Sequence, residues 1–227
     1  MKIRWYGQST FALTGEHRVA IDPFGDMSEA AARGRITFDY PPIDGLEADL
    51  LLITHEHMDH NGAEAVGGDP VVIRSTAGTF ESPVGEVVGV SSEHDGVAGT
   101  QRGPNTIYRF TLDGVRVCHL GDLGQPALRP EQIAAIGEID VLFVPAGDGP
   151  TVGGEAAAQV VRDLRPRLAI PMHYRTPAIG FLDPPDAFLE ALGAPVEHAD
   201  SSEIEVEPLL GSHDEPRVVL LAPPLPA

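Results

Sequence analysis

The sequence predicts a single α/β domain, with strands through the first half of the chain and strands alternating with helices in the second. A chain of 227 residues, of which 42% are hydrophobic, is long enough to bury one large core. No proline- and serine-rich linker or block of like charge divides it. We therefore expect one domain over residues 1–210, followed by a C-terminal extension over 211–227 that ends in a proline-rich tail, extended or disordered from residue 222.

Short apolar runs bounded by turn-forming residues predict the strands. They fall at 2–6, 9–13, 18–22, 50–54, 70–73, 86–90, 105–112, 115–119, 140–144, 168–172 and 203–206. Residues 24–46, which are rich in glycine, proline and polar groups, predict a long loop between the third and fourth strands.

Helical spacing of apolar residues is found in fewer places. Residues 130–136 carry a proline in the first turn and two isoleucines on one face. Residues 153–164 place four apolar side chains at helical spacing before Pro166 ends the pattern. Residues 184–192 predict a third helix, and 59–65 are expected to begin a fourth.

The most informative segment directly follows the apolar run at 50–53. It carries three histidines and an aspartate on a short turn: His55, His57, Asp59 and His60. Side chains at the end of a buried strand can converge on one point, and imidazole and carboxylate groups suit Zn²⁺ and its neighbours among the divalent metals. Since this set offers more donors than one tetrahedral ion needs, the segment predicts a metal site with room for two ions.

The pattern His-x-His-x-Asp-His after an apolar strand resembles the signature of the metallo-β-lactamase superfamily, which implies a four-layer αββα sandwich found in hydrolases and some redox proteins. Segments 92–96, 118–122 and 170–174 follow in the family's order. The likeness covers roughly residues 1–210. Three segments narrow the resemblance to the subgroup that includes ascorbate-6-phosphate lactonase: 21–23, 103–108 and 171–174.

The resemblance implies a ligand set for two divalent ions, with zinc expected and Mn, Fe or Ni as alternatives. The first ion would be held by His55, His57 and His94, and the second by Asp59, His60 and His173. Asp122 would bridge them, because the two oxygens of one carboxylate can bind separate ions about 3.5–4 Å apart. The alternatives are a surface-loop histidine for His94 and a hydrogen-bonded histidine at a strand end for His173.

Three further residues are expected behind the ligands. Asp22 either orients a ligand histidine or forms a turn before Pro23. His119 is expected to pack or hydrogen-bond behind the site. Thr151 either caps the following helix or faces the substrate, and the sequence favours capping. The single cysteine, Cys118, is expected to be a packed thiol.

Composition narrows the function. With 34 acidic residues against 15 basic ones, the net charge of −19 disfavours nucleic acid as a partner and leaves a small-molecule substrate. The chain has no Gly-x-Ser-x-Gly sequence, and its one lysine, Lys2, rules out a phosphate-binding Gly-Lys loop. We therefore expect a metal-dependent hydrolase in which a metal-bridging hydroxide attacks a small ester, lactone or amide, with Asp59 and Asp122 as catalytic residues. The lactonase resemblance favours a lactone.

Three other functions are compatible with a metal site of this kind. A phosphodiesterase or nuclease would use the same ligands but needs a basic groove. A diiron redox protein of this superfamily typically has Glu at the place of His57, and a flavin partner. A non-catalytic metal-binding protein is the third.

Without a signal peptide or membrane-length apolar run, we expect a cytoplasmic protein that makes no membrane contact. The sequence leaves the substrate, the native metal and a homo-oligomeric state open.

Overall fold

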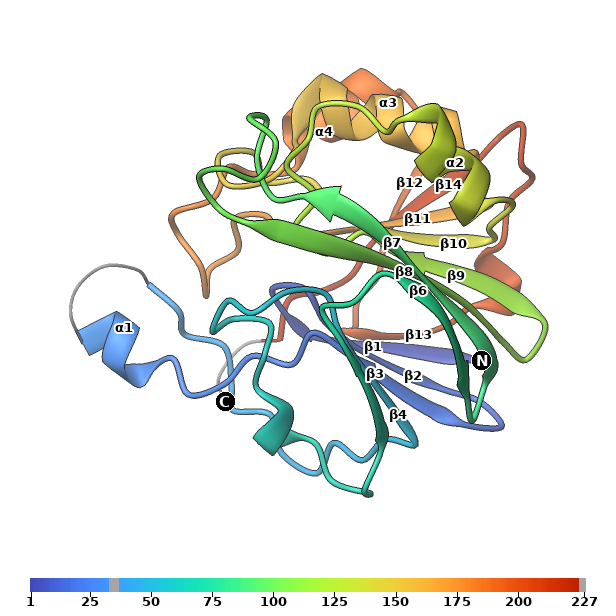
Figure 1. The fold of residues 1–227 in the computed structure, drawn as a ribbon. Helices are drawn as coiled ribbons and strands as arrows, with labels where there is room; N and C mark the ends of the chain where they lie inside the picture. Colours follow the sequence, from blue (N-terminus) through green and yellow to red (C-terminus); the bar gives the residue numbers. More distant parts are fainter. Residues whose placement is uncertain (33–36, 225–227) are drawn as a thin grey trace.

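The computed structural model describes residues 1–32 and 37–224. Residues 33–36, in the predicted long loop, and 225–227, in the predicted tail, lie outside the described residues. Two sheets pack face to face, and helices cover the outer face of the larger one (Figure 1). The six-stranded sheet has the order β13-β1-β2-β3-β4-β5, formed by Glu203–Glu205, Lys2–Gly7, Thr10–Thr14, Arg18–Ile21, Leu50–Ile53 and Val71–Arg74.

The eight-stranded sheet is mixed. Its order is β12-β14-β11-β10-β9-β8-β7-β6, formed by Val196–His198, Arg217–Leu220, Leu168–Met172, Val141–Pro145, Val115–His119, Pro104–Leu112, Gly85–Glu93 and Gly78–Ser82. The strands from β6 to β9 pair antiparallel, and those from β9 to β12 pair parallel. This division agrees with the predicted change from strands alone to alternating strands and helices.

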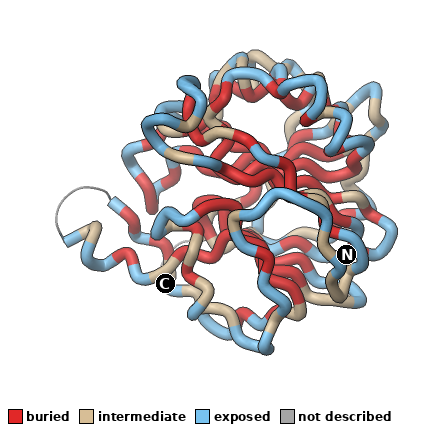
Figure 2. Tube along the Cα trace, viewed as in Figure 1, coloured by how far each residue is buried: buried red, intermediate tan, exposed pale blue. Residues whose placement is uncertain are grey.

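The core between the sheets is aromatic and aliphatic. Phe11 on β2 meets Phe143 on β10 with ring centroids 4.2 Å apart, and Trp5, Ile170 and Leu52 belong to the same buried cluster. Buried residues are concentrated where the sheets face each other and beneath the helices (Figure 2). Removal of this apolar surface from water is the main contribution to the packing of the two sheets.

The helices α2 (Pro130–Ile136), α3 (Gly154–Leu164) and α4 (Asp186–Leu192) lie where the sequence predicts them. The apolar face of α3, with Ala157, Val160 and Val161, packs in a second cluster on the outer face of the larger sheet. The outer face of the smaller sheet is covered by a 3-10 turn, η1 (Ala63–Ala65), and the loop around Leu46. The metallo-β-lactamase sandwich is confirmed, with this thin layer as its fourth.

Several details differ from the sequence prediction. The helix expected from 59–65 is only the short η1, and the loop predicted over 24–46 contains the helix α1 (Ser28–Ala32). The strands β6, β12 and β14 were not predicted; β6 and β12 are short and lie at the edges of the larger sheet, where little of their surface is buried. The strand β14 lies within 211–227, between β11 and β12, so part of the expected extension belongs to the larger sheet.

The strand ends position the site. The loops after β4, β7, β9 and β11 and the turn between β1 and β2 meet along one rim of the sandwich, which brings together residues far apart in the sequence. No described helix is long and apolar enough to cross a membrane.

Candidate metal centre

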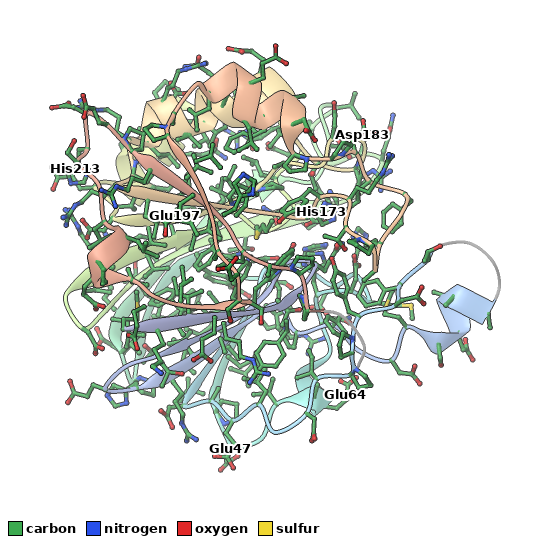
Figure 3. The ribbon with its side chains drawn as sticks, turned by 180° about the vertical axis from the view of Figure 1, so that it is seen from behind. Glu47, Glu64, His173, Asp183, Glu197 and His213 are labelled. Atoms are coloured by element: carbon green, nitrogen blue, oxygen red, sulfur yellow. The ribbon has the colours of Figure 1, made fainter. Side chains whose placement is uncertain are left out.

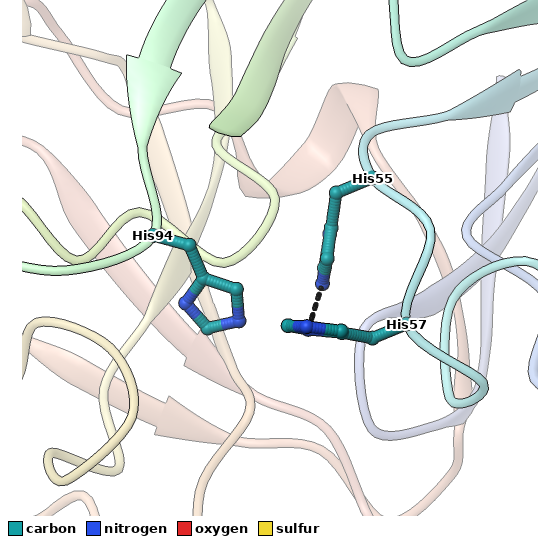
Figure 4. Close-up of side chains that lie close together, drawn as sticks. All are labelled: His55, His57 and His94. Atoms are coloured by element: carbon teal, nitrogen blue, oxygen red, sulfur yellow. Dashed lines mark hydrogen bonds between the residues drawn. The ribbon is translucent and has the colours of Figure 1, made fainter. Parts of the chain in front are cut away.

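The first group of metal-binding donors consists of His55, His57 and His94. Their ligand atoms all lie within 4.8 Å of one another. His55 and His57 project from the loop after β4, and His94 projects toward them from the end of β7 (Figure 4). Nε2 of His55 and Nδ1 of His57 are 3.0 Å apart. His57 is exposed to solvent whereas the other two are buried, so this group opens on one side.

The second group consists of Asp59, His60 and His173, whose ligand atoms also lie within 4.8 Å of one another. Figure 3 views the molecule from behind and places His173 between the two sheets, with His213 at the periphery. Each group has three donor residues. The first consists of three imidazoles, whereas the second consists of one carboxylate and two buried imidazoles. This composition matches the predicted division of the ligands.

Asp122 lies between the two groups. Its Oδ2 is 3.2 Å from Nε2 of His94 in the first group and 3.2 Å from Nε2 of His173 in the second. Its Oδ1 is 3.3 Å from Nε2 of His60. A single carboxylate therefore faces donors of both groups, which is the position that a bridging ligand needs.

Two buried atoms point to what the cluster holds. Nε2 of His60 and Oδ1 of Asp122 are buried and, although they lie 3.3 Å apart, make no hydrogen bond to each other or to any other described residue. Leaving such atoms without a partner costs free energy, so a native structure normally satisfies them with water or an ion. Nitrogen and carboxylate donors that converge on one space, with orphaned buried atoms among them, fit divalent metal ions.

A third combination, Asp22 with His55 and His60, also has its ligand atoms within 4.8 Å of one another. The oxygens of Asp22 are already used, however. Its Oδ1 accepts a hydrogen bond from the backbone N–H of Thr54 at 2.7 Å, and its Oδ2 accepts one from the Thr54 hydroxyl at 2.7 Å. Oδ2 also lies 2.9 Å from Nδ1 of His60. Asp22 thus orients His60, the first of its two predicted alternatives.

The other ligand histidines are held in a similar way. Nδ1 of His94 lies 3.1 Å from the carbonyl oxygen of Pro150, which leaves Nε2 to face Asp122. Nδ1 of His173 lies 3.5 Å from the hydroxyl of Thr151. Thr151 does not cap the following helix: α3 has Gly153 as its N-cap residue, with no side-chain cap bond. The prediction that favoured capping was wrong, and Thr151 instead lies behind a candidate ligand.

His119 is fully buried behind the site, as the sequence predicts. The backbone N–H of Gly121 donates to Nδ1 of His119 at 3.1 Å, and Nε2 lies 3.0 Å from the carbonyl oxygen of Ser9. Since both ring nitrogens have partners, this imidazole has no free donor for a metal. Cys118 is buried as well, and burial raises the pKa of its thiol, so it is a packed side chain.

The backbone around Asp122 depends on a close approach. Gly121 has φ of 57°, and a Cβ at this position would lie 2.3 Å from Oδ1 of Asn105. That same oxygen accepts the backbone N–H of Asp122 at 3.0 Å. Only glycine permits the contact, which fixes the loop that presents the carboxylate.

Gln8 is a site residue that the sequence analysis missed. It is buried in the turn between β1 and β2 with a positive φ of 51°, and its side-chain N–H donates to Oδ2 of Asp59 at 2.9 Å. Its Oε1 makes no hydrogen bond within the described chain. The only signal in the sequence is a polar turn between two apolar strands, which is common in proteins without any functional role.

Charge is unevenly distributed within the cluster. Burial and the neighbouring His60 lower the pKa of His55 to about 2, and burial with His94 lowers that of His57. Burial alone would lower the pKa of His60, but the carboxylates of Asp122 and Asp59 outweigh it and raise the pKa well above its usual value. Burial likewise opposes ionisation of Asp122, but His173 and His60 hold its pKa well below the usual value. The two carboxylates therefore favour the charged form of His60, whereas burial favours the neutral forms of His55 and His57.

Fold and site together define a protein of the β-lactamase superfamily. Residues 2–173 match the family model described as "Beta-lactamase superfamily domain". A protein of this superfamily from Thermotoga maritima, a candidate Zn-dependent hydrolase, has a crystal structure that superposes with a TM-score of 0.76 at 32% identity, covering 97% of each chain.

Curated relatives narrow the class further. The "UPF0173 metal-dependent hydrolase" of Thermococcus onnurineus is 32% identical over 78% of this chain and 85% of its own length. The protein of that name from Pelotomaculum thermopropionicum is 29% identical over 91% of this chain and 96% of its own length. The chain belongs to the UPF0173 metal-dependent hydrolase family. These relatives do not show the narrower likeness to ascorbate-6-phosphate lactonase, which stays a prediction.

Proposed function

We propose that this protein is a metal-dependent hydrolase that cleaves small ester, lactone or amide substrates at a centre of two divalent ions. The observation that carries the proposal is the position of Asp122, whose carboxylate lies 3.2 Å from a histidine of each donor group. Membership of a family of metal-dependent hydrolases supports the reaction class. The choice of a carbonyl substrate, and of a lactone in particular, rests on the sequence resemblance alone.

The residues divide the work. When bound, the metal ions supply Lewis acidity and lower the pKa of water toward neutrality. His55, His57 and His94 would hold one ion, Asp59, His60 and His173 would hold the other, and Asp122, whose carboxylate faces both groups, would be shared between them. The substrate enters on the side of His57 and Asp59, the two ligands that are not fully buried. Gln8 fixes Oδ2 of Asp59, which leaves Oδ1 to orient the substrate or to transfer a proton.

Zinc is the proposed metal, with Mn, Fe or Ni as alternatives. The ligands are imidazoles and carboxylates, a mixture that all four metals accept. The single cysteine is buried outside both groups, so thiolate coordination plays no part. The description of the Thermotoga maritima relative as a candidate Zn-dependent hydrolase favours zinc. A cytoplasmic location remains part of the proposal.

The test combines metal analysis with a substrate screen. Protein reconstituted with Zn²⁺, Mn²⁺ or Fe²⁺ should bind two ions per chain, and the loaded enzyme should hydrolyse members of a panel of lactones, esters and amides. Asp122→Ala should lower turnover by about a hundredfold or more while its circular dichroism stays that of the wild type. Asp200→Ala, which removes an exposed aspartate far along the chain, is the matched control.

Each arm has an outcome that contradicts the proposal. Less than one ion per chain after reconstitution would remove the metal centre, and unchanged turnover in Asp122→Ala would remove its bridging role. Cleavage of phosphodiesters without any carbonyl substrate would favour a phosphodiesterase built on the same ligands. Two bound ions with no turnover in the whole panel would favour a non-catalytic metal-binding protein.

A further inference from the structure

A small cavity adjoins the first donor group. It has a volume of about 190 Å³ and is lined by His55 and His57 together with Glu56, Ser75, Arg102 and Thr106. The cavity and the candidate metal centre thus share two histidines as a common wall. A group held in this cavity would belong to a molecule whose neighbouring atoms reach the metal centre.

Arg102 is the unusual residue of this lining. Within the described part of the chain, its guanidinium group has no ion pair or hydrogen bond, although Arg74, Arg116 and Arg129 each pair with a glutamate. In a chain with 34 acidic residues against 15 basic ones, an arginine has many potential partners. An unpaired guanidinium beside the metal centre is therefore available for an anion from outside the chain.

The one acidic side chain of the lining is already neutralised. Glu56 receives two hydrogen bonds from Arg74, at 2.8 Å and 2.6 Å, and one from the hydroxyl of Ser75 at 2.7 Å. These bonds occupy both of its carboxylate oxygens. Arg102 is thus the only charge of the lining without a partner among the described residues, and bound divalent ions would add further positive charge nearby.

The loop that carries Arg102 is fixed by a buried carboxylate. Asp95, next to the candidate ligand His94, accepts backbone N–H groups of Val97, Gly99, Gln101 and Arg102 at 2.8–2.9 Å. The last of these bonds holds the backbone of Arg102 itself. The backbone of Arg102 is therefore fixed relative to His94 before any ligand binds, so that only the exposed side chain must be ordered on binding.

We propose that Arg102 binds an anionic group, a carboxylate or a phosphate, which the substrate carries apart from the bond that is hydrolysed. The inference rests on the proposed function, since it names the substrate class of the same site. The cavity is smaller than sites that take up drug-sized molecules, which are about 300–1,000 Å³. A short acid with a few carbon atoms between its anionic group and the scissile carbonyl fits this volume.

A binding experiment tests Arg102 without requiring turnover. Zinc-loaded protein is titrated by calorimetry with succinate, 3-phosphonopropionate and butyrate. Each can place one carboxylate at the metal centre, but only the first two carry a second anionic group. Wild-type protein should prefer at least one of these two over butyrate, and Arg102→Gln should reduce that preference about ten- to a hundredfold. Whether succinate or the phosphonate binds more tightly identifies the carboxylate or the phosphate as the natural group.

Two further variants separate recognition from general charge. Arg102→Lys keeps the charge but not the planar guanidinium, so it should restore part of the preference. Arg217→Gln is the matched control, because Arg217 also lacks an ion pair among the described residues. It lies away from the site: its neighbour across the sheet is Leu168, at the opposite end of β11 from His173. The proposal is overturned if Arg102→Gln keeps the wild-type preference, if wild type has none, or if Arg217→Gln loses as much as Arg102→Gln.

A kinetic experiment distinguishes this inference from the proposed function. Mono-4-nitrophenyl succinate and 4-nitrophenyl butyrate differ by a distal carboxylate, and Arg102→Gln should raise KM for the succinyl ester more than for the butyryl ester. If wild type hydrolyses neither ester, the proposed ester hydrolysis fails for this pair while the titration still decides the role of Arg102. Equal effects on both esters would overturn the inference even if both are hydrolysed.

Discussion

Oδ2 of Asp22 lies 2.9 Å from Nδ1 of His60, so the other ring nitrogen of His60 faces Asp122. Asp22 directly follows β3, and Thr54, which holds its carboxylate by two hydrogen bonds, directly follows β4. These strands are parallel neighbours, with Ile21 opposite Leu52. The sheet register therefore sets the orientation of a candidate metal ligand.

Asp22→Ala should weaken metal binding. Without this carboxylate His60 loses the bond that orients its ring, and loss of such a partner typically costs 10- to 100-fold in metal affinity. Competition with a chromophoric chelator measures the affinity of each ion. We expect the loss at the ion held by Asp59, His60 and His173. Asp26→Ala, which removes an exposed aspartate of the same loop, is the control, and equal affinities in the two variants would contradict the orienting role.

The candidate ligands can be predicted from the sequence more readily than the residues around them. The four donors between His55 and His60 are close in the sequence, so their convergence needs only one turn at a strand end. Gln8 and Arg102 reach the site through sheet pairing and through a loop fixed by Asp95. A single sequence contains no local signal for such contacts, because they depend on which strands become neighbours.

The strands also differ in how far the sequence alone predicts them. The fully buried strands β4, β10 and β11 are continuous apolar runs and were predicted. The edge strand β6 has polar or glycine residues at four of its five positions, Phe80 being the exception, and gains its strand conformation from pairing with β7. Only the pairing partner distinguishes such a segment from a loop.

Substitution of individual histidines should separate ligands from supporting residues. His55→Ala should lose one ion per chain, whereas His119→Ala should keep the metal content of the wild type because both of its ring nitrogens are already bonded. His119→Ala should nevertheless lower the free energy of unfolding by about 2–4 kcal/mol, since it empties a buried position against Phe11. Element analysis and denaturant unfolding give the two measurements.

The exposed His198 provides the control for this series, because His198→Ala should change neither metal content nor stability. Loss of an ion from His119→Ala alone would show that the ligand set is wrong. Retention of both ions by His55→Ala would remove His55 from the first group.

Asp140 predicts a pH dependence of stability outside the metal centre. Burial would raise its pKa, but hydrogen bonds from Arg116 outweigh burial and lower the pKa to about 2 from the usual 3.8. A carboxyl with a lowered pKa in the folded state stabilises the protein above the pKa of the unfolded state, and this contribution is lost as the pH falls from about 4 to 2. With the Arg116 side chain 32% exposed, screening reduces the contribution to roughly 1–2 kcal/mol.

Asp140→Asn should therefore be less stable than the wild type at pH 7, and the difference should shrink between pH 4 and pH 2. Urea unfolding of metal-free protein at several pH values measures it, and the use of metal-free protein removes any contribution from loss of ions in acid. Asp200→Asn, at an exposed position, should match the wild type throughout. A difference that stays constant down to pH 2 would show that the lowered pKa contributes nothing.

Substrate charge gives the last prediction, because the chain as a whole is strongly acidic whereas its candidate metal centre is suited to cations. The net charge of −19 repels a polyanionic strand over the whole surface, whereas a compact anion needs only the local field of Arg102 and the bound ions. We therefore expect hydrolysis of small molecules and none of nucleic acid. The assay compares single-stranded DNA, RNA, a bis-nitrophenyl phosphate and a panel of lactones at two salt concentrations.

The dependence on salt distinguishes the two substrate classes. A nucleic acid bound through several phosphates releases counterions, so its affinity falls steeply as salt rises. Reaction of a small anion with a local site should change far less, because few counterions are displaced and the ions of the centre lie close to the bound group. Rapid cleavage of DNA or RNA whose rate falls steeply with added salt would replace the small-molecule hydrolase by a nuclease that uses the same seven ligands.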